Sequence, residues 1–363
     1  MMIQQANNLD TVHSGGKCNG VCGGSDGVCR GGVRIRYLDV IKCFAILIVI
    51  HGHVKGFGFG LDDTYSNPSQ LMLYAFNMPI FFFVSGFLAW KDGSTKMADV
   101  VNQLKKKFLY LVVPAVVFTL FRINLVHGEP LTYTLEHGFG GYWFTITLFE
   151  CFALFYLLKY ICSHKHGLAA LLLTISAVGV GIVSVRPLIG PRIIDLNHLL
   201  KYFQFFAFGV LARMYQPQYY RLIQSEWVKC FSLMGFFVLL YVLFSVSIPN
   251  RLFHLLRDVV LRYLGVIVVL SFFVANADWF SRDTRICRII NLVGRNSLAI
   301  YLLQYFFIPH SASLERWAGS IDATTLHIIC FLWSAVIVAV CMCFILLLGN
   351  SKIFGKYALG KKS

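Results

Sequence analysis

Charged side chains are scarce in this 363-residue chain, and that scarcity excludes most soluble folds. Only 13% of the residues are Asp, Glu, Lys or Arg, whereas 57% are hydrophobic; a soluble domain carries about 25% charged residues. The apolar runs lack the alternation that marks barrel strands, and they recur at the roughly 20-residue length that a helix needs to cross a bilayer. Since only helices and closed barrels satisfy their backbone groups in lipid, we predict an all-α polytopic membrane protein.

The chain also lacks a recognisable pattern for metal binding or disulfide formation. Cys18, Cys22 and Cys29 follow His13 in a glycine-rich stretch, but their spacing matches no zinc pattern. Most of the other cysteines lie in or beside apolar runs, where cysteine behaves as a small hydrophobe. We therefore predict neither a metal site nor disulfides.

We expect a bundle of about ten transmembrane helices between residues 37 and 350. The candidate spans are 38–57, 70–90, 108–126, 142–161, 168–185, 198–215, 230–248, 259–275, 289–308 and 326–349. Ten spans place both termini on one side, and no long connection leaves room for a soluble domain. Any chemistry must therefore be carried out by the bundle itself.

The distribution of Lys and Arg predicts the orientation. Of 32 such residues, 21 lie at connections on the side of the termini and seven on the other side, and basic connections favour the cytoplasm. We expect an inner (plasma) membrane protein with a disordered cytoplasmic tail over 1–36 and a basic cytoplasmic tail over 351–363. The net charge of +15 is then explained by orientation, without a nucleic-acid partner.

The remaining four basic residues fall within spans or at their edges, where a charge is a functional candidate. These are Lys42, Lys201, Arg262 and Arg295.

The first span contains four polar side chains that cost several kcal/mol unless the bundle satisfies them. Lys42 and His53 are 11 positions apart, a rotation only about 20° from three full turns, so they share one helix face about 16 Å apart along the axis. Asp39 lies on roughly the same face and can pair with Lys42. His51 lies about 180° from Lys42 and is less suited to act with it.

This arrangement resembles a known family. Lys42, ten residues and then His53 resemble the Arg/Lys-X10-His motif of the membrane-bound acyltransferase 3 family of O-acyltransferases, and Leu38–His53 is similar to its LDxxK/R...GH pattern. Phe76–Leu88 (FNMPIFFFVSGFL) resembles the family segment FHMPLFFFLSGYL, with Asn77 in place of its usual His.

Weaker similarities follow in the order of the family, and Gln304 stands where many relatives carry His. They are Lys105–Pro114 (KKKFLYLVVP), Tyr142–Phe144 (YWF) and Gly294–Leu303 (GRNSLAIYLL). The resemblance implies an acyltransferase 3 transmembrane domain over 37–350.

The resemblance also implies a reaction: transfer of an acyl group, most often acetyl from acetyl-CoA, to a sugar hydroxyl of a surface polysaccharide or glycolipid. Acyl-CoA is then a substrate, and no permanently bound cofactor is expected. His53 is the candidate general base, because the unperturbed pKa of imidazole lies near neutral pH; an acyl-histidine intermediate is the other option. Lys42 either polarises the thioester carbonyl, holds a phosphate or anchors the helix at the interface, and Asp39 either orients Lys42 or marks the helix start.

Candidate contacts for the CoA phosphates are Lys105, Lys106, Lys107 and Arg295. The positive-inside rule explains the three lysines without any ligand. Similarly, close helix packing explains Ser85 and Gly86, and an interfacial belt explains Tyr142 and Trp143.

One alternative function is left open by composition alone. Ten spans with buried charges also suit a transporter or flippase for a lipid-linked saccharide. Transporters often show paired halves with broken helices at matching positions, and no such pairing is visible in the sequence.

Overall fold

The structure is a computed structural model that describes residues 35–61, 67–93, 95–122, 140–162, 164–185, 196–309 and 311–348. Every regular element in these stretches is helical, which confirms the all-α prediction. Most of the predicted N-terminal tail with Cys18, Cys22 and Cys29, and the whole predicted C-terminal tail, lie outside the described residues.

Two kinds of turn join or extend the α-helices: η1, η2 and η5 are π turns, and η4 and η6 are 3-10 turns. In chain order they are α2 (Arg36–His53), η1 (Val54–Gly58), α3 (Pro68–Tyr74), α4 (Asn77–Ala89), α5 (Met97–Lys107), η2 (Phe108–Val112), α6 (Val113–Arg122), η4 (Gly140–Tyr142), α8 (Trp143–Ile161), α9 (Lys165–Val185), α10 (Leu196–Met214), α11 (Gln216–Gln224), α12 (Glu226–Ser245), α13 (Asn250–Leu255), η5 (Leu256–Leu261), α14 (Arg262–Ala275), α15 (Ala277–Phe280), α16 (Arg285–Arg295), α17 (Ser297–Leu303), η6 (Gln304–Phe306), α18 (Ala312–Gly319) and α19 (Ala323–Leu348).

The predicted count of ten spans is not confirmed. Within the described residues, seven helices are long and apolar enough to cross a membrane, and a bent pair raises the number to as many as eight. The predicted spans 108–126 and 198–215 correspond to helical stretches, α5–η2–α6 and α10, that do not meet this criterion. The three lysines at the end of α5 and the polar side chains of α10 lower their apolarity.

The predicted span 289–308 is a broken helix. α16 and the α17–η6 segment meet at an angle of 63°. The side chain of Thr284 caps the start of α16 by accepting a hydrogen bond from the Cys287 amide at 3.2 Å, and Asn296 stands at the break. Hydropathy correctly located the apolar run but could not show that the chain changes direction within it.

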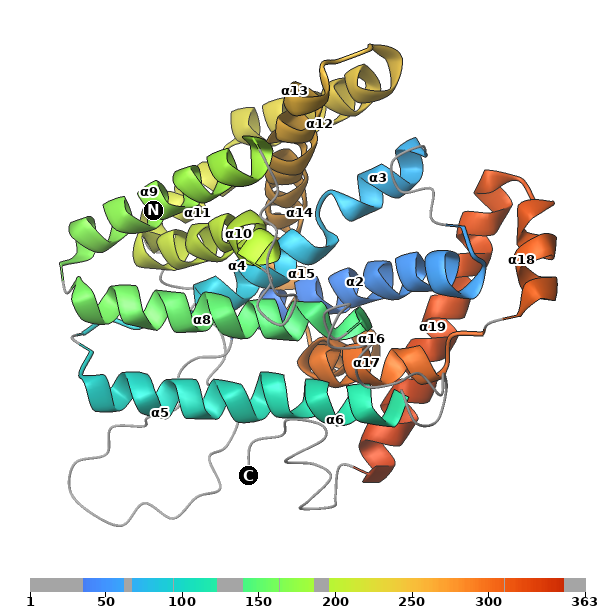
Figure 1. Cartoon of the computed structure of the whole chain (residues 1–363), viewed down its shortest axis with the longest axis horizontal. Helices are drawn as coiled ribbons and strands as arrows, with labels where there is room; N and C mark the ends of the chain where they lie inside the picture. The colour runs from blue at the N-terminus through green and yellow to red at the C-terminus, as the bar shows by residue number, and fades with distance from the viewer. Residues whose placement is uncertain are drawn as a thin grey trace.

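Helix α2 is central to the bundle. It packs against α4, α14, α16, α17 and α19. In Figure 1 α8 and the α5–α6 helix lie side by side. In the most apolar window of residues 36–58, 78% of the residues are buried. The corresponding share is only 22% for α9 and for α12. Asp39 and His51 of α2 are accordingly buried within the protein.

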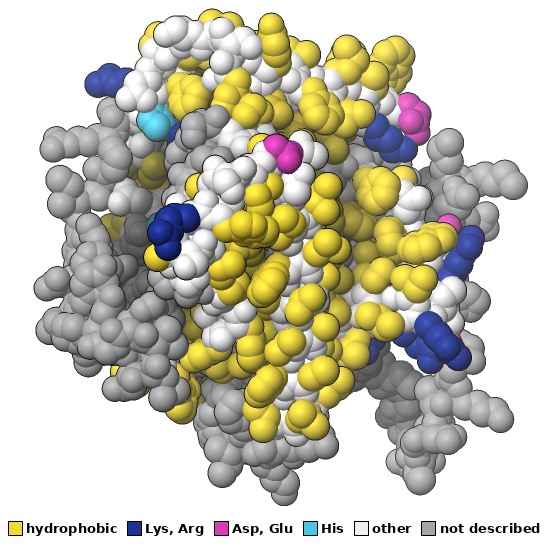
Figure 2. Space-filling model, turned by 90° about the vertical axis from the view of Figure 1, so that its right-hand side faces the viewer, with side chains coloured by type: hydrophobic (Ala, Val, Ile, Leu, Met, Phe, Trp, Pro, Cys, Tyr) yellow, Lys and Arg dark blue, Asp and Glu magenta, His cyan; other side chains and the backbone are white. Residues whose placement is uncertain are grey.

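The outer face is apolar. Figure 2, which views the side where α19 lies, shows hydrophobic side chains over most of the described surface and few charged ones. From α19, the exposed residues include Leu332, Val336 and Leu347. Such a surface fits the hydrocarbon of a bilayer.

The segment 76–88 forms α4, and it packs closely against α10. A Cβ atom on Gly86 would lie 2.0 Å from the backbone oxygen of Phe206, so only glycine allows this approach. Close helix packing therefore explains Gly86, as predicted. Ser85 instead lines a cavity.

Candidate active site

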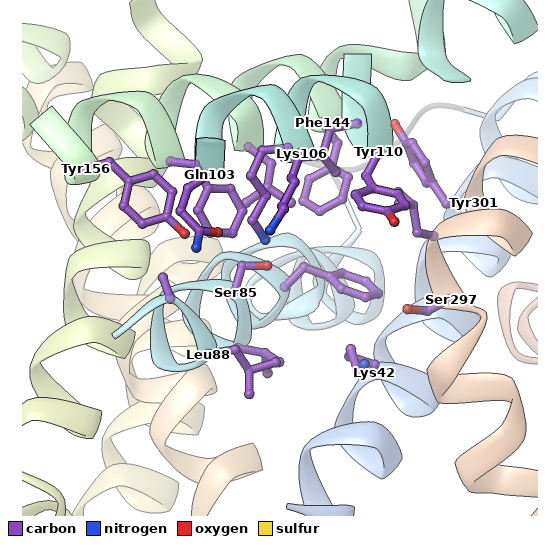
Figure 3. A pocket seen from close by; sticks show the side chains of 18 of the residues that line it. Lys42, Ser85, Leu88, Gln103, Lys106, Tyr110, Phe144, Tyr156, Ser297 and Tyr301 are labelled. Atoms are coloured by element: carbon purple, nitrogen blue, oxygen red, sulfur yellow. The ribbon is translucent and has the colours of Figure 1, made fainter. Parts of the chain in front are cut away.

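A cavity of about 1030 Å³ opens between α2, α4, α5, η2, α8, α16 and α17. Figure 3 shows Lys106 and Gln103 reaching into it from one side and Lys42 from the opposite side. Its wall combines apolar side chains with a set of basic ones, which are Lys42, Lys91, Lys106, Lys107, Lys159 and Arg295.

The wall contributed by α2 is one stripe of the helix. Lys42, Ile46 and Val49 line the cavity, and their spacing of three and four residues keeps them on one face. His53 continues the same stripe one turn beyond Val49, but it is not part of the lining. The face of α2 that carries Lys42 and His53 therefore lines the cavity from Lys42 to Val49, and His53 lies one turn beyond the lined part.

The carboxylate of Asp39 holds the basic groups at this end of α2. Lys42 Nζ lies 2.8 Å from Asp39 Oδ1, and Arg295 Nε lies 4.0 Å from Asp39 Oδ2. The Asp39 residue is buried, so its charge is compensated by two cations that both reach the cavity. A Cβ atom on Gly294 would lie only 1.8 Å from the backbone oxygen of Asp39, so glycine lets α16 bring Arg295 to this position.

The three consecutive lysines of α5 separate in space. Lys106 and Lys107 line the cavity, whereas Lys105 does not. The ammonium group of Lys107 also lies 3.7 Å from the ring centroid of Phe152, a cation–π contact. Of the four candidate phosphate contacts, Arg295, Lys106 and Lys107 therefore line the same cavity.

Two basic residues of the cavity were missed by sequence reasoning. Lys91 follows α4, and Lys159 lies in the last turn of α8. Both were counted only as orientation signals. In the structure Lys159 Nζ donates to the backbone oxygen of Lys91 at 2.6 Å, and both side chains line the cavity. Asp92 and Asp99 are the acidic residues of the lining, so the described wall carries six basic and two acidic side chains.

Aromatic rings surround His53. Its ring stacks with that of Tyr305, with centroids 5.0 Å apart, and lies 5.4 Å from Phe57. His53 Nε2 is 3.4 Å from Tyr305 Oη. Tyr301, which lines the cavity, is 6.5 Å from His53 between centroids. The imidazole therefore sits next to the cavity end bounded by Tyr301.

His51 faces away from this site, as its helical position predicts. It is fully buried, and its Nε2 lies 3.0 Å from His327 Nδ1 of α19. His327 Nε2 in turn lies 2.7 Å from Ser69 Oγ. These contacts join α2, α3 and α19 and give His51 a packing role.

The other intramembrane charges form a separate group. Asp258 lies 3.1 Å from Arg262 and 3.3 Å from Lys201, and Arg262 Nη1 donates to Tyr202 Oη at 3.1 Å. None of these residues lines the described cavity. Arg262, one of the four basic residues predicted within or at the edge of a span, thus has Asp258 and Tyr202 as partners.

Within the part of the chain that the structure describes, no group of three or more His, Cys, Asp or Glu side chains could hold a metal ion.

Comparisons with known proteins agree with this membrane bundle. A family model described as an acyltransferase domain, that of acyltransferase 3, matches residues 35–348. The chain is also 26% identical over 217 residues to nodulation protein NolL of Mesorhizobium japonicum, a stretch covering 56% of this chain and 53% of that protein. The chain thus matches about half the length of this curated relative. No solved structure matches the chain significantly.

Proposed function

Because this chain belongs to the acyltransferase 3 family, whose model spans residues 35–348, we propose that it transfers an acyl group from acyl-CoA to a sugar hydroxyl. The acyl group is acetyl in the simplest case, and the acceptor is a surface polysaccharide or glycolipid. The observation that carries this proposal is a basic cavity that leads along one stripe of α2 towards His53.

The basic cavity suits the donor. CoA carries a diphosphate and a further phosphate at one end and the thioester at the other end of a flexible arm. Six basic side chains against two acidic ones attract such a polyanion, and Arg295 offers the planar donor pattern that phosphates favour. Lys106, Lys107 and Arg295 are the proposed phosphate contacts, together with Lys42. Lys105 lies outside the lining and is not one of them.

The separation of Lys42 and His53 assigns them different tasks. They are about 16 Å apart along α2, so they cannot both touch one thioester carbonyl. With His53 at the reacting carbon, Lys42 binds a phosphate or the pantetheine arm, and Asp39 orients it at 2.8 Å.

The proposed reaction begins when the sugar hydroxyl attacks the thioester carbon while His53 takes its proton. The carbon–sulfur bond then breaks, and the CoA thiolate takes the proton back from the imidazolium. The products are a sugar ester and CoA.

The donor enters from the cytoplasm of an inner (plasma) membrane protein in this proposal, because the Lys and Arg distribution predicts that side for the start of α2. Asp39 and Lys42 lie near the start of α2, and His53 ends that helix, so a bound acyl group reaches well across the roughly 30 Å hydrocarbon layer. Thiol labelling of Lys42→Cys and His53→Cys from each side tests this. Labelling of both positions only from the cytoplasm would remove the transmembrane part of the proposal.

Acyl transfer by the purified protein tests the function. Radiolabelled acetyl-CoA and a panel of glycan acceptors are supplied to the parent, to His53→Ala and to Lys42→Ala. We expect His53→Ala to abolish transfer and Lys42→Ala to raise the KM for acetyl-CoA. His164→Ala, an exposed histidine before α9, is the matched control and should match the parent. Parental activity in His53→Ala would overturn the mechanism, and absence of transfer with every donor and acceptor would favour transport.

A further inference from the structure

We propose that Tyr305 is a positioning residue that fixes which nitrogen of His53 accepts the proton, an inference that rests on the proposed role of His53 as base. The two residues are 252 positions apart in the chain, yet Tyr305 Oη lies 3.4 Å from His53 Nε2. Their rings stack at an interplanar angle of 30°. Phe57 lies 5.4 Å from the imidazole centroid, so rings of both η1 and η6 contact it.

The hydrogen-bond direction decides the tautomer. A tyrosine hydroxyl has one proton, and Tyr305 donates it to the backbone oxygen of Gly141 at 2.9 Å. Tyr305 Oη therefore offers a lone pair to His53, and Nε2 contacts it as an N–H donor. A neutral imidazole with its proton on Nε2 has its basic lone pair on Nδ1. Nδ1 is buried in this structure, so it takes the sugar proton once the acceptor displaces the groups around it.

The backbone oxygen of Gly141 is itself held in place. Tyr301 Oη donates to the same oxygen, which has two lone pairs for the two donors. Tyr142 Oη donates to the backbone oxygen of Leu302 at 3.0 Å. Three tyrosine hydrogen bonds therefore join the η4 turn to α17 and η6.

Gly141 is required for this arrangement. A Cβ atom at this position would lie 2.3 Å from both Cζ and Oη of Tyr305. Any larger residue would displace the ring from the carbonyl and from His53. The position of the Tyr305 ring therefore requires glycine at position 141 of η4.

A base oriented by a third group is a common arrangement in nucleophilic catalysis. Here the third group is a neutral hydroxyl, which orients the imidazole without placing another charge inside the membrane. α2 passes into the π turn η1 directly after His53, and π turns are frequent at functional sites.

The test is the tautomer of His53 measured by 15N NMR on histidine-labelled protein, with His53 signals identified by their loss in His53→Gln. We expect the parent to carry the proton on Nε2 and Tyr305→Phe, which removes only the hydroxyl, to show a mixture of tautomers. In the transfer assay we expect Tyr305→Phe to lower kcat about tenfold or more with the KM for acetyl-CoA unchanged. Tyr263→Phe, whose hydroxyl contacts the backbone oxygen of Gln204, should resemble the parent in both.

A parent with its proton on Nδ1, or a Tyr305→Phe variant with parental kcat, would overturn the inference. The NMR measurement needs neither donor nor acceptor. An Nε2–H tautomer that Tyr305→Phe disturbs, in a protein that transfers no acyl group, would support the positioning role and reject the proposed function. CoA binding by Tyr305→Phe at parental affinity establishes that the variant is folded.

Discussion

Lys106 and Lys107 should strengthen the binding of CoA, whereas their neighbour Lys105 should not. The three residues have the same charge and lie in the same helix, but only Lys106 and Lys107 line the cavity. Replacement by glutamine keeps the helix propensity and removes the charge. The comparison separates a binding role from a role in membrane orientation, for which all three lysines count equally.

The magnitude follows from the setting of the two side chains. A charge pair at 4 Å is worth about 1 kcal/mol in water and about 4 kcal/mol near a protein surface. Lys106 is exposed and Lys107 is partly buried over Phe152, so we take about 1–2 kcal/mol for each. Each replacement should then weaken CoA binding by about 5- to 30-fold, and Lys105→Gln by less than about 2-fold.

Isothermal titration calorimetry with CoA in detergent measures these affinities without an acceptor. The affinity of the parent should also fall as salt is raised, because the contacts are ionic. Equal losses in all three variants, or unchanged affinity in Lys106→Gln and Lys107→Gln, would refute the assignment of this cavity to the donor.

Three further substitutions test the packing around the site. Asp39→Asn should lower stability by about 2 kcal/mol, because it removes a buried carboxylate from two cations that are partly exposed; thermal unfolding in detergent measures this, and an unchanged midpoint would contradict it. Gly294→Ala should lower both the unfolding midpoint and the CoA affinity, since its Cβ would clash with the backbone of α2. Parental values of both would show that α2 and α16 can move apart without loss. His51→Ala should cost about 1 kcal/mol by losing the bond to His327, with CoA affinity unchanged; weaker CoA binding would place His51 in the site.

The sequence was most informative where polar residues interrupt an apolar run. The positions of Asp39, Lys42 and His53 on one helix fixed their shared face, since the geometry of a single helix is regular. The pairing of Asp39 with Lys42 followed from their spacing of three and is present. These features needed no knowledge of any other helix.

Features that depend on two segments could not be predicted from the residues of either one. Lys91 follows α4 and Lys159 lies in the last turn of α8, and each alone is indistinguishable from an orientation signal. The contact of Gly141 with Tyr305 joins positions 164 residues apart. Tyr142 was expected in an interfacial belt, but it is fully buried and bonded to Leu302, because η4 docks on α17 instead of ending at the bundle surface.

The polar content of each helix accounts for its place in the bundle. α2 carries charged and imidazole side chains on two faces, and a lipid-facing position would leave one of those faces in hydrocarbon. Accordingly, α2 lies at the centre of the bundle, in contact with α4, α14, α16, α17 and α19. α9 and α12, whose middle turns are almost entirely apolar, have only 22% of the residues in their most apolar window buried. α10 packs between α4 and α9, so its polar side chains can face protein, and a helix in that position does not need to be apolar on every side. The hydropathy criterion therefore accepts α2 but misses α10, whose polar side chains are tolerated because the helix packs against other helices.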